Sequence, residues 1–120
     1  MLDTVERISA HDIVYDIIPK LKATESLVNN TLRDMIAEVD NFDEHSRYQL
    51  LQQEFELEIM MINMNLDHLL KRYAQEIQAV ADSSGSNNAG SMLELDQHER
   101  LAIDSAKKLY KRARAIQAGK

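Results

Sequence analysis

The sequence predicts an all-α protein, an antiparallel bundle of three to four helices around one long central helix. Apolar residues recur at steps of three and four along most of the chain, which is the period of a helix face. Proline occurs once and glycine three times in 120 residues, and nothing in the chain has the pattern of a β-domain. A chain of this length is typical of one domain, so we expect residues 1–120 to form a single helical domain.

The first helix is expected at about residues 12–39, with Asp12 as its N-cap, after a short lead that has a helical turn around Val5 and Ile8. Its apolar stripe contains Val14, Ile17, Ile18, Leu21, Val28, Leu32, Met35 and Val39. Pro19 lies inside this stripe, removes an amide donor and crowds the preceding turn. Two interpretations remain open, a helix kinked at Pro19 or a short helix that ends before it. The unbroken apolar phase favours the kink.

A long helix is expected at about residues 43–81. Asn41 with Glu44 resembles a capping box at its start, and Asp43 with Ser46 is the competing start. One face carries Tyr48, Leu51, Phe55, Ile59, Ile62, Leu66, Leu69, Tyr73, Ile77 and Val80. At ~1.5 Å per residue the helix is roughly 58 Å long. A compact domain of this size needs less, so we expect part of the helix to contact another protein.

The centre of this helix is apolar on more than one side. Met60, Met61 and Met64 add apolar surface beyond the main stripe, and a helix apolar on several sides is buried on several sides. Ordinary core filling is the alternative, but methionine is also common at adaptable binding surfaces. We therefore expect a homo- or hetero-oligomer with protein partners, whose interface contains Ile59, Met60, Met61, Ile62, Met64 and Leu66.

Residues 82–92 read DSSGSNNAGSM, without periodicity or bulky side chains, which predicts a flexible linker. A C-terminal helix is expected at about residues 96–118. Asp96 is its expected N-cap and Glu99 the partner three positions later. Its packing face is marked by Ala102, Ala106, Leu109, Ala113 and Ile116.

Charge is distributed unevenly along the chain. The net charge is −6. Six of the fourteen basic residues lie from Lys107 onward, and no acid follows Lys107. Phosphate contacts are possible at Lys107, Lys108, Lys111, Arg112 and Arg114. These residues also complement the negative end of the helix dipole, and without interleaved aromatics any nucleic-acid contact would be weak and non-specific.

No pattern of catalysis or metal binding is present. The four histidines belong to no HExxH or ExxH motif, and there is no cysteine. Glu54 and Glu58 share a helix face, which we interpret as a solvated face or salt-bridge partners. Neither a GxSxG elbow nor a Gly-rich phosphate loop occurs. We expect no catalytic, cofactor-binding or metal-ligating residues, and a protein that is not an enzyme.

Cellular location follows from three absences in the sequence. Residues 1–10 lack the apolar segment of a signal peptide, and no run of about 18 apolar residues could span a membrane. The lack of cysteine suits a reducing compartment. We expect an intracellular protein, cytoplasmic or nuclear.

The order of elements resembles a known family. A long helix ends in LDHLLKRYAQEI (Leu66–Ile77), a polar loop follows, and then comes LELDQHERLAIDSAKKLYKRAR (Leu93–Arg114). This arrangement is similar to the helical A-domain of subunits of GINS, the heterotetrameric replication factor that joins the replicative helicase. Leu95 and Glu99 stand where that family has an L-x-x-x-E helix start.

The basic-apolar end of the family's long helix is matched by Leu69, Lys71 and Arg72. The chain departs from the family in having methionine and asparagine where more arginine is usual, and in having no pattern for the family's small β-domain. The resemblance implies a non-catalytic scaffold in DNA replication whose long helix packs against sister subunits. A second hypothesis is a small helical adaptor or chaperone that binds one client protein through the same methionine-rich surface.

Overall fold

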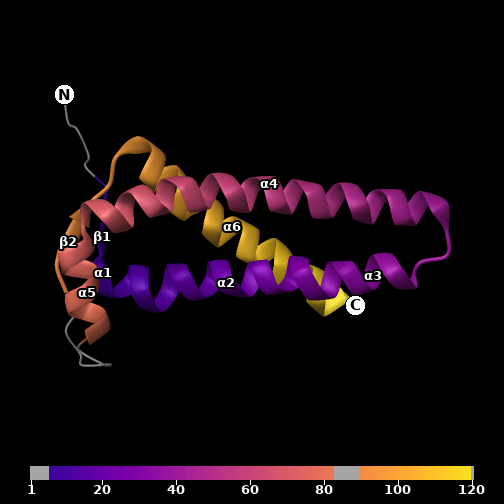
Figure 1. The fold of residues 1–120 in the computed structure, drawn as a ribbon, viewed down its shortest axis with the longest axis horizontal. Coiled ribbons are helices and arrows are strands. Elements are labelled where there is room, and N and C mark those ends of the chain that lie inside the picture. The colour runs from indigo at the N-terminus through magenta and orange to yellow at the C-terminus, as the bar shows by residue number, and fades with distance from the viewer. Residues whose placement is uncertain (1–5, 83–89, 120) are drawn as a thin grey trace.

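The computed structural model describes residues 6–82 and 90–119, and helices make up most of this part of the chain. An N-terminal helix covers residues 10–38, and α4 (Phe42–Arg72) returns antiparallel to it. α6 (Gln97–Gly119) crosses both and packs against each of them (Figure 1). The prediction of an all-α bundle around a long helix is confirmed.

The N-terminal helix is continuous but changes its winding twice. Its segments are α1 (Ala10–Asp12), the π-helical η1 (Ile13–Ile17), α2 (Ile18–Ser26), the π-helical η2 (Leu27–Leu32) and α3 (Arg33–Glu38). Ile17 and Ile18 keep right-handed helical dihedrals, and the Ile18 N–H donates to the carbonyl of Ile13, five residues back. The wider turn lies directly before Pro19, whose ring crowds the preceding turn. The interpretation with two separate helices is therefore wrong.

This helix begins earlier than expected. Ser9 is its N-cap, because the Ser9 hydroxyl accepts a hydrogen bond from the Asp12 N–H at 3.0 Å. Asp12 has helical dihedrals and no capping hydrogen bond from its side chain. The assignment of Asp12 as N-cap is corrected for this reason.

The helix expected at 43–81 is divided in two. Its start is capped by Asn41, whose side-chain oxygen accepts from the N–H groups of Asp43 and Glu44 at 2.8 and 3.1 Å. α4 ends at Arg72, because Tyr73 has φ −118° and ψ 34°, and α5 (Ala74–Asp82) then runs steeply across the end of α4 (Figure 1). An unbroken helix through residue 81 was wrong.

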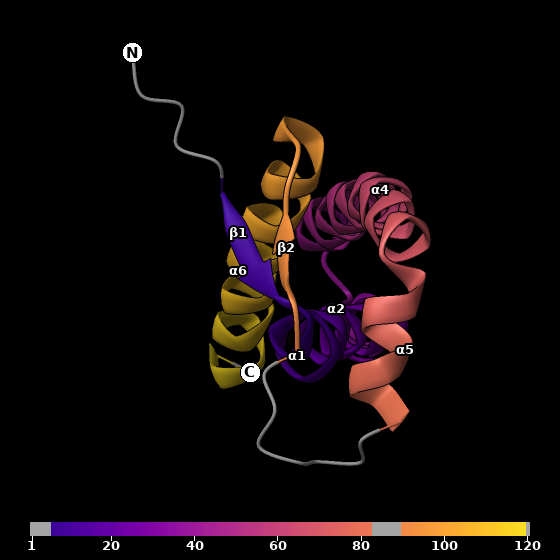
Figure 2. The same ribbon diagram turned by 90° about the vertical axis from the view of Figure 1, so that its left-hand side faces the viewer.

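A two-stranded sheet lies over one end of the bundle. β1 (Arg7–Ser9) pairs antiparallel with β2 (Met92–Glu94), with Ile8 opposite Leu93, and the pair lies beside α6 and α1 (Figure 2). The expected helical turn around Ile8 is corrected, since Ile8 is in a strand. Of the linker expected at 82–92, Asp82 is in α5 and Met92 is in β2, Gly90 and Ser91 directly precede that strand, and residues 83–89 lie outside the described residues.

The core lies where the N-terminal helix, α4 and α6 meet. The packing face predicted for α6 is confirmed, with Ile116 only partly buried at its end. No helix within residues 6–82 and 90–119 is long and apolar enough to cross a membrane. The buried apolar side chains of the three helices include Ile13, Ile17, Leu21, Leu27, Val28, Leu32, Phe55, Ile59, Ile62, Leu66, Leu69, Ala102, Ile103, Ala106, Leu109 and Ala113.

Candidate functional site

The predicted interface divides into a buried half and an exposed half. Ile59, Ile62 and Leu66 are at most 8% exposed and belong to the core. They share a helix face with Phe55 and Leu69, which pack in the same core, so their assignment to a partner contact is corrected. The exposed half consists of Met60, Met61 and Met64.

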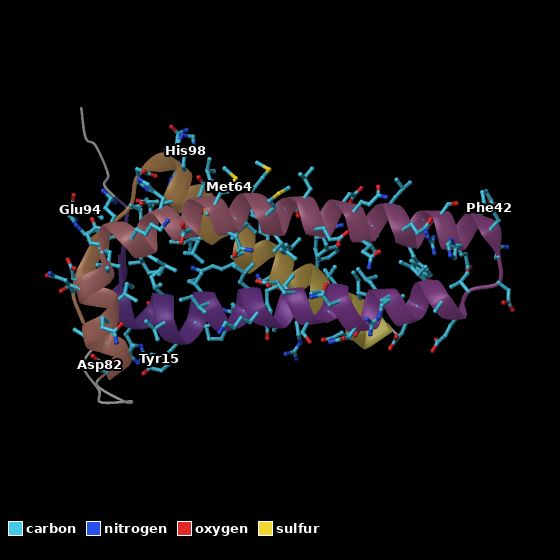
Figure 3. The ribbon with its side chains drawn as sticks, viewed as in Figure 1. Tyr15, Phe42, Met64, Asp82, Glu94 and His98 are labelled. Atoms are coloured by element: carbon cyan, nitrogen blue, oxygen red, sulfur yellow. The ribbon has the colours of Figure 1, made fainter. Side chains whose placement is uncertain are left out.

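These methionines belong to a longer apolar stripe on the outer side of α4. We call it the outer stripe, and its members are between 54% and 69% exposed: Leu50, Leu57, Met60, Met61 and Met64. Met64 points away from the N-terminal helix (Figure 3). Leu50 and Leu57 were not among the predicted interface residues, although both precede Met64 at seven-residue steps, which place side chains on one side of a helix.

A groove runs along one flank of the outer stripe. It has a volume of about 650 Å³, and all of its lining residues come from α4. Met60, Met64 and Leu70 supply apolar side chains, and the buried Ile59 and Leu66 also line it. The polar lining residues are Glu56, Asn63 and Asp67.

A smaller groove lies on the other flank, between α4 and α6. Its volume is about 220 Å³, and its lining includes Met61 from α4 and Leu101 from α6. Leu101 is itself 48% exposed, so apolar surface continues from the outer stripe onto α6. The outer stripe is therefore flanked by a shallow, open groove along α4 and by a smaller groove between α4 and α6.

The surroundings of the outer stripe are acidic. Between Tyr48 and Leu70 the chain has no lysine or arginine, and its acids are Glu54, Glu56, Glu58 and Asp67. On the α6 side, Arg112 lies 3.8 Å from the Glu54 carboxylate and 4.0 Å from that of Glu58, so the interpretation of these acids as salt-bridge partners is confirmed.

The acids on the opposite flank are less well neutralised. Asp67 pairs with Lys71 at 2.9 Å, and both side chains are exposed. Among the described residues, no basic side chain lies within ion-pair distance of Glu56. The larger groove therefore carries unneutralised negative charge along its edge.

The five residues suggested as phosphate contacts lie together on the exposed side of α6. Arg112 stacks on the Phe55 ring at 5.0 Å, and Arg114 donates to the Tyr110 hydroxyl at 3.1 Å. Lys107, Lys108 and Lys111 are exposed and make no ion pair with the described residues. Two of the five are thus engaged within the fold, and the lysines remain open to solvent.

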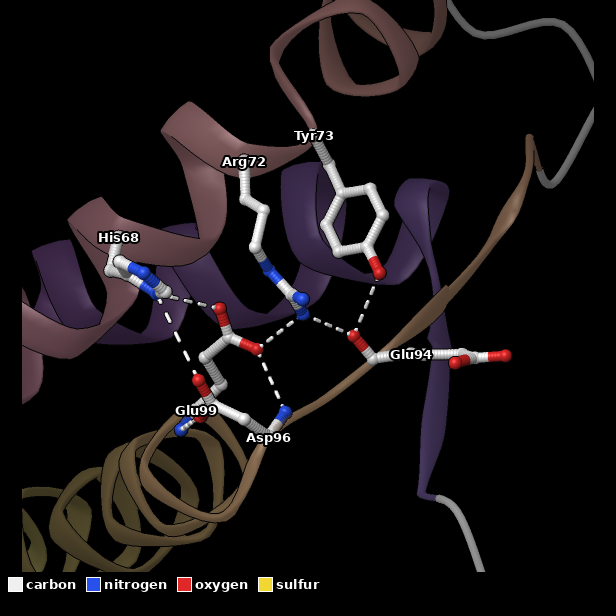
Figure 4. A network of polar contacts seen from close by, with 6 residues as sticks. All are labelled: His68, Arg72, Tyr73, Glu94, Asp96 and Glu99. Atoms are coloured by element: carbon white, nitrogen blue, oxygen red, sulfur yellow. Dashed lines mark hydrogen bonds and ion pairs between the residues drawn. The ribbon is translucent and has the colours of Figure 1, made fainter.

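Glu99 forms a junction between α4, β2 and α6 that sequence reasoning found only in part. Its side chain is fully buried, and Oε1 accepts from Arg72 Nη2 at 2.7 Å and from the Asp96 N–H at 2.9 Å (Figure 4). The Glu99 N–H donates to Asp96 Oδ1 at 2.7 Å, which confirms the predicted capping box. Oε2 lies 3.0 Å from His68 Nδ1.

The same junction binds the strand. The Glu94 carbonyl accepts from Arg72 Nη2 at 2.6 Å and from the Tyr73 hydroxyl at 2.9 Å (Figure 4). Both donors lie at the end of α4, so the end of α4 is held against β2. His68 and Arg72 are four residues apart on one helix face, and this spacing was the available sign that they act together.

One group among the described residues could hold a metal ion. Ligand atoms of His68, Asp96 and Glu99 lie within 4.8 Å of one another. A cation there would sit beside the Arg72 guanidinium, which already bonds to the Glu99 carboxylate. The arrangement therefore favours a network that stabilises the fold, since charged donors already satisfy the buried carboxylate.

Comparison of the chain with protein-family models, with curated proteins and with solved structures gave no match. The resemblance to GINS subunits therefore stays a prediction. The geometry of the outer stripe and its grooves is the basis for a functional proposal.

Proposed function

We propose that this protein is a non-enzymatic, intracellular interaction subunit that binds another protein along the outer stripe of α4. The observation that carries the proposal is the outer stripe itself. Five large apolar side chains on one side of a helix are exposed, and a shallow groove flanks them on each side. Contiguous exposed apolar patches of this kind mark interaction surfaces, whereas single exposed hydrophobic residues are ordinary.

The physical gain from covering the stripe is large. Removing a leucine or methionine side chain from water contributes roughly 1.5–3 kcal/mol when burial is complete. Met60, Met61 and Met64 are adjacent on the surface and would be buried together by one partner helix lying along α4. Beyond the methionines the stripe continues only toward the start of α4, through Leu50 and Leu57, so a partner has less apolar surface to cover there.

The resemblance to GINS subunits supports a partner within a DNA-replication complex, because the long helix of that family packs against sister subunits. The adaptor or chaperone hypothesis draws support from the methionines. Their unbranched, polarizable side chains adapt to differently shaped apolar surfaces, which suits a protein that holds one client.

The test is purification of the tagged chain from its native cells, with a Met61→Glu variant in parallel. Met61 is 56% exposed, so the variant should keep its helix content, measured by circular dichroism. A carboxylate buried in an interface without a partner is costly, and we expect the bound protein to be reduced at least about tenfold.

Glu38→Gln on α3 is the matched control, because Glu38 is exposed and lies outside the outer stripe. A defined multi-subunit complex would support the scaffold function, and a single bound protein would support the adaptor. If Met61→Glu retains its partner at the level of Glu38→Gln, the outer stripe is not the binding surface and the proposal is overturned.

A further inference from the structure

We infer that the occupant of the larger groove is a basic amphipathic helix of a partner protein rather than a second copy of this chain. This inference rests on the proposed function and specifies the chemistry of the partner. It starts from the charges along the groove. Glu56 and Asp67 both line it, eleven positions apart on α4, which is roughly 16 Å along the helix axis at ~1.5 Å per residue.

The apolar lining lies between these two acids. Met60, Met64 and Leu70 would contact apolar side chains of the occupant, while Asn63 can donate and accept hydrogen bonds. A complementary helix therefore has one apolar face flanked by lysine or arginine residues about three turns apart. Such a helix would meet both carboxylates at once.

A second copy fits this charge pattern poorly. A two-fold contact between antiparallel α4 helices, centred on Met60 and Met61, would place Leu57 beside Met64 of the other copy. Because a two-fold axis brings like flanks together, the same register brings Glu56 to within about 3 Å, measured along the helix axis, of Asp67 of the other copy. Among the described residues Glu56 has no basic partner and Asp67 has only its exposed pair with Lys71, whereas a basic partner helix turns the same carboxylates into attractive contacts.

Lys71 competes with the proposed partner for one end of the groove. It holds Asp67 at 2.9 Å in a pair whose side chains are 79% and 60% exposed. Exposed pairs of this kind are weak, so a partner cation can replace Lys71 at low cost. Removing the Lys71 charge should therefore strengthen binding of the partner, whereas removing either carboxylate should weaken it.

The experiment uses the full chain labelled at its methionine methyl groups and two designed peptides. Each peptide has about 18 residues, long enough to form a helix on binding, with leucines on one face. One carries lysines and the other glutamates at two flanking positions eleven residues apart. Methyl NMR reads Met60 and Met64 in the groove, with Met35 on α3 and Met92 on β2 as internal references.

We expect the lysine peptide to shift the Met60 and Met64 methyl signals while Met35 and Met92 stay in place. Glu56→Gln and Asp67→Asn should each weaken binding roughly two- to fivefold, and Lys71→Gln should strengthen it about twofold. Salt raised from about 0.05 to about 0.5 M should weaken binding several-fold by screening. Glu38→Gln is the control of equal charge change away from the groove.

Other outcomes separate this inference from the proposed function. Equal binding of the lysine and glutamate peptides would overturn the charge argument while leaving an apolar binding surface. If neither peptide binds and light scattering shows a dimer that Met61→Glu abolishes, the occupant is a second copy and only the inference falls. If neither peptide binds and the chain stays near 14 kDa at all concentrations, the inference is overturned, and the proposed function then depends on the native partner alone.

Discussion

The end of the molecule that carries the sheet and the opposite end are held in different ways. At the sheet end, Glu99 joins α4 and α6, and Arg72 and Tyr73 hold the β2 backbone. Helices from three directions and a strand pair meet there, as Figure 2 shows. Buried polar groups are paired at this end, and Leu69 of α4 and Leu93 of β2 are fully buried.

The opposite end is a projecting pair of helices. From Arg33 to Glu54, spanning α3 and the start of α4, no residue is buried. Phe42 is 80% exposed at the tip of this distal arm, as Figure 3 shows. Near its base, Gln52 Nε2 reaches the Val28 carbonyl of η2 at 3.4 Å.

The two ends differ in how much apolar surface their helices bury. A helix that packs against one neighbour buries only a narrow face, whereas α4 after Glu54 also packs against α6. Stability is therefore concentrated in the half that carries the junction. The distal arm and the outer stripe are left as surface that a partner can cover without competing with the core.

The largest expected difference is between two leucines of the same helix. Leu69→Ala removes a side chain with 0% exposure and should lower the free energy of unfolding by about 2–5 kcal/mol. Leu50→Ala, in the distal arm at 61% exposure, should change it by less than about 0.5 kcal/mol. Urea denaturation of both variants checks this. Equal losses would mean that the distal arm is packed as well as the core.

Glu99 gives the next largest effect. Glu99→Gln removes the charge that Arg72 and His68 bind in a buried site, and we expect a loss of about 1.5–3 kcal/mol. The matched control is Glu94→Gln. Among the described residues the Glu94 side chain pairs with Arg7 alone, at 3.4 Å on the surface, so this substitution should cost less than about 0.5 kcal/mol. The same denaturation experiment compares them. A loss at Glu94 equal to that at Glu99 would place the stabilising charge in the strand pair instead.

Periodicity predicted the core faces well and the ends of helices less well. The spacing of Phe55, Ile59, Ile62 and Leu66 fixes which face of α4 is apolar, and that face is the buried one. The same pattern continues through Ile77, so the break at Tyr73 leaves no trace in the apolar phase. Tyr73 leaves the helical conformation where it binds the Glu94 carbonyl, a contact between segments 21 residues apart.

The candidate site was predicted in part for a similar reason. Periodicity identifies apolar side chains but not how many neighbouring helices exist to cover them. Met60, Met61 and Met64 lie off the main apolar stripe of α4. The N-terminal helix and α6 cover the face that carries that stripe, so the three methionines stay exposed. The capping box of Asp96 and Glu99 was readable from local spacing, whereas the approach of His68 and Arg72 depends on tertiary packing.

The smallest predicted loss of stability concerns Gly90, a glycine at the sheet end of the molecule. Gly90 has φ +74°, where side chains are disfavoured, and an added Cβ would lie 2.4 Å from Val80 Cγ2 and 3.2 Å from Ala10 Cβ. Gly90→Ala should therefore force α5 and α1 apart and lower the free energy of unfolding by about 1–2 kcal/mol. Gly119→Ala is its control, because among the described residues no atom outside its own helix backbone and chain neighbours lies within 4 Å of the added methyl group. If thermal denaturation shows equal stability for both variants, the contact between α1 and α5 is loose, and the sheet end would then derive its stability from the Glu99 network and the core rather than from close packing around α5.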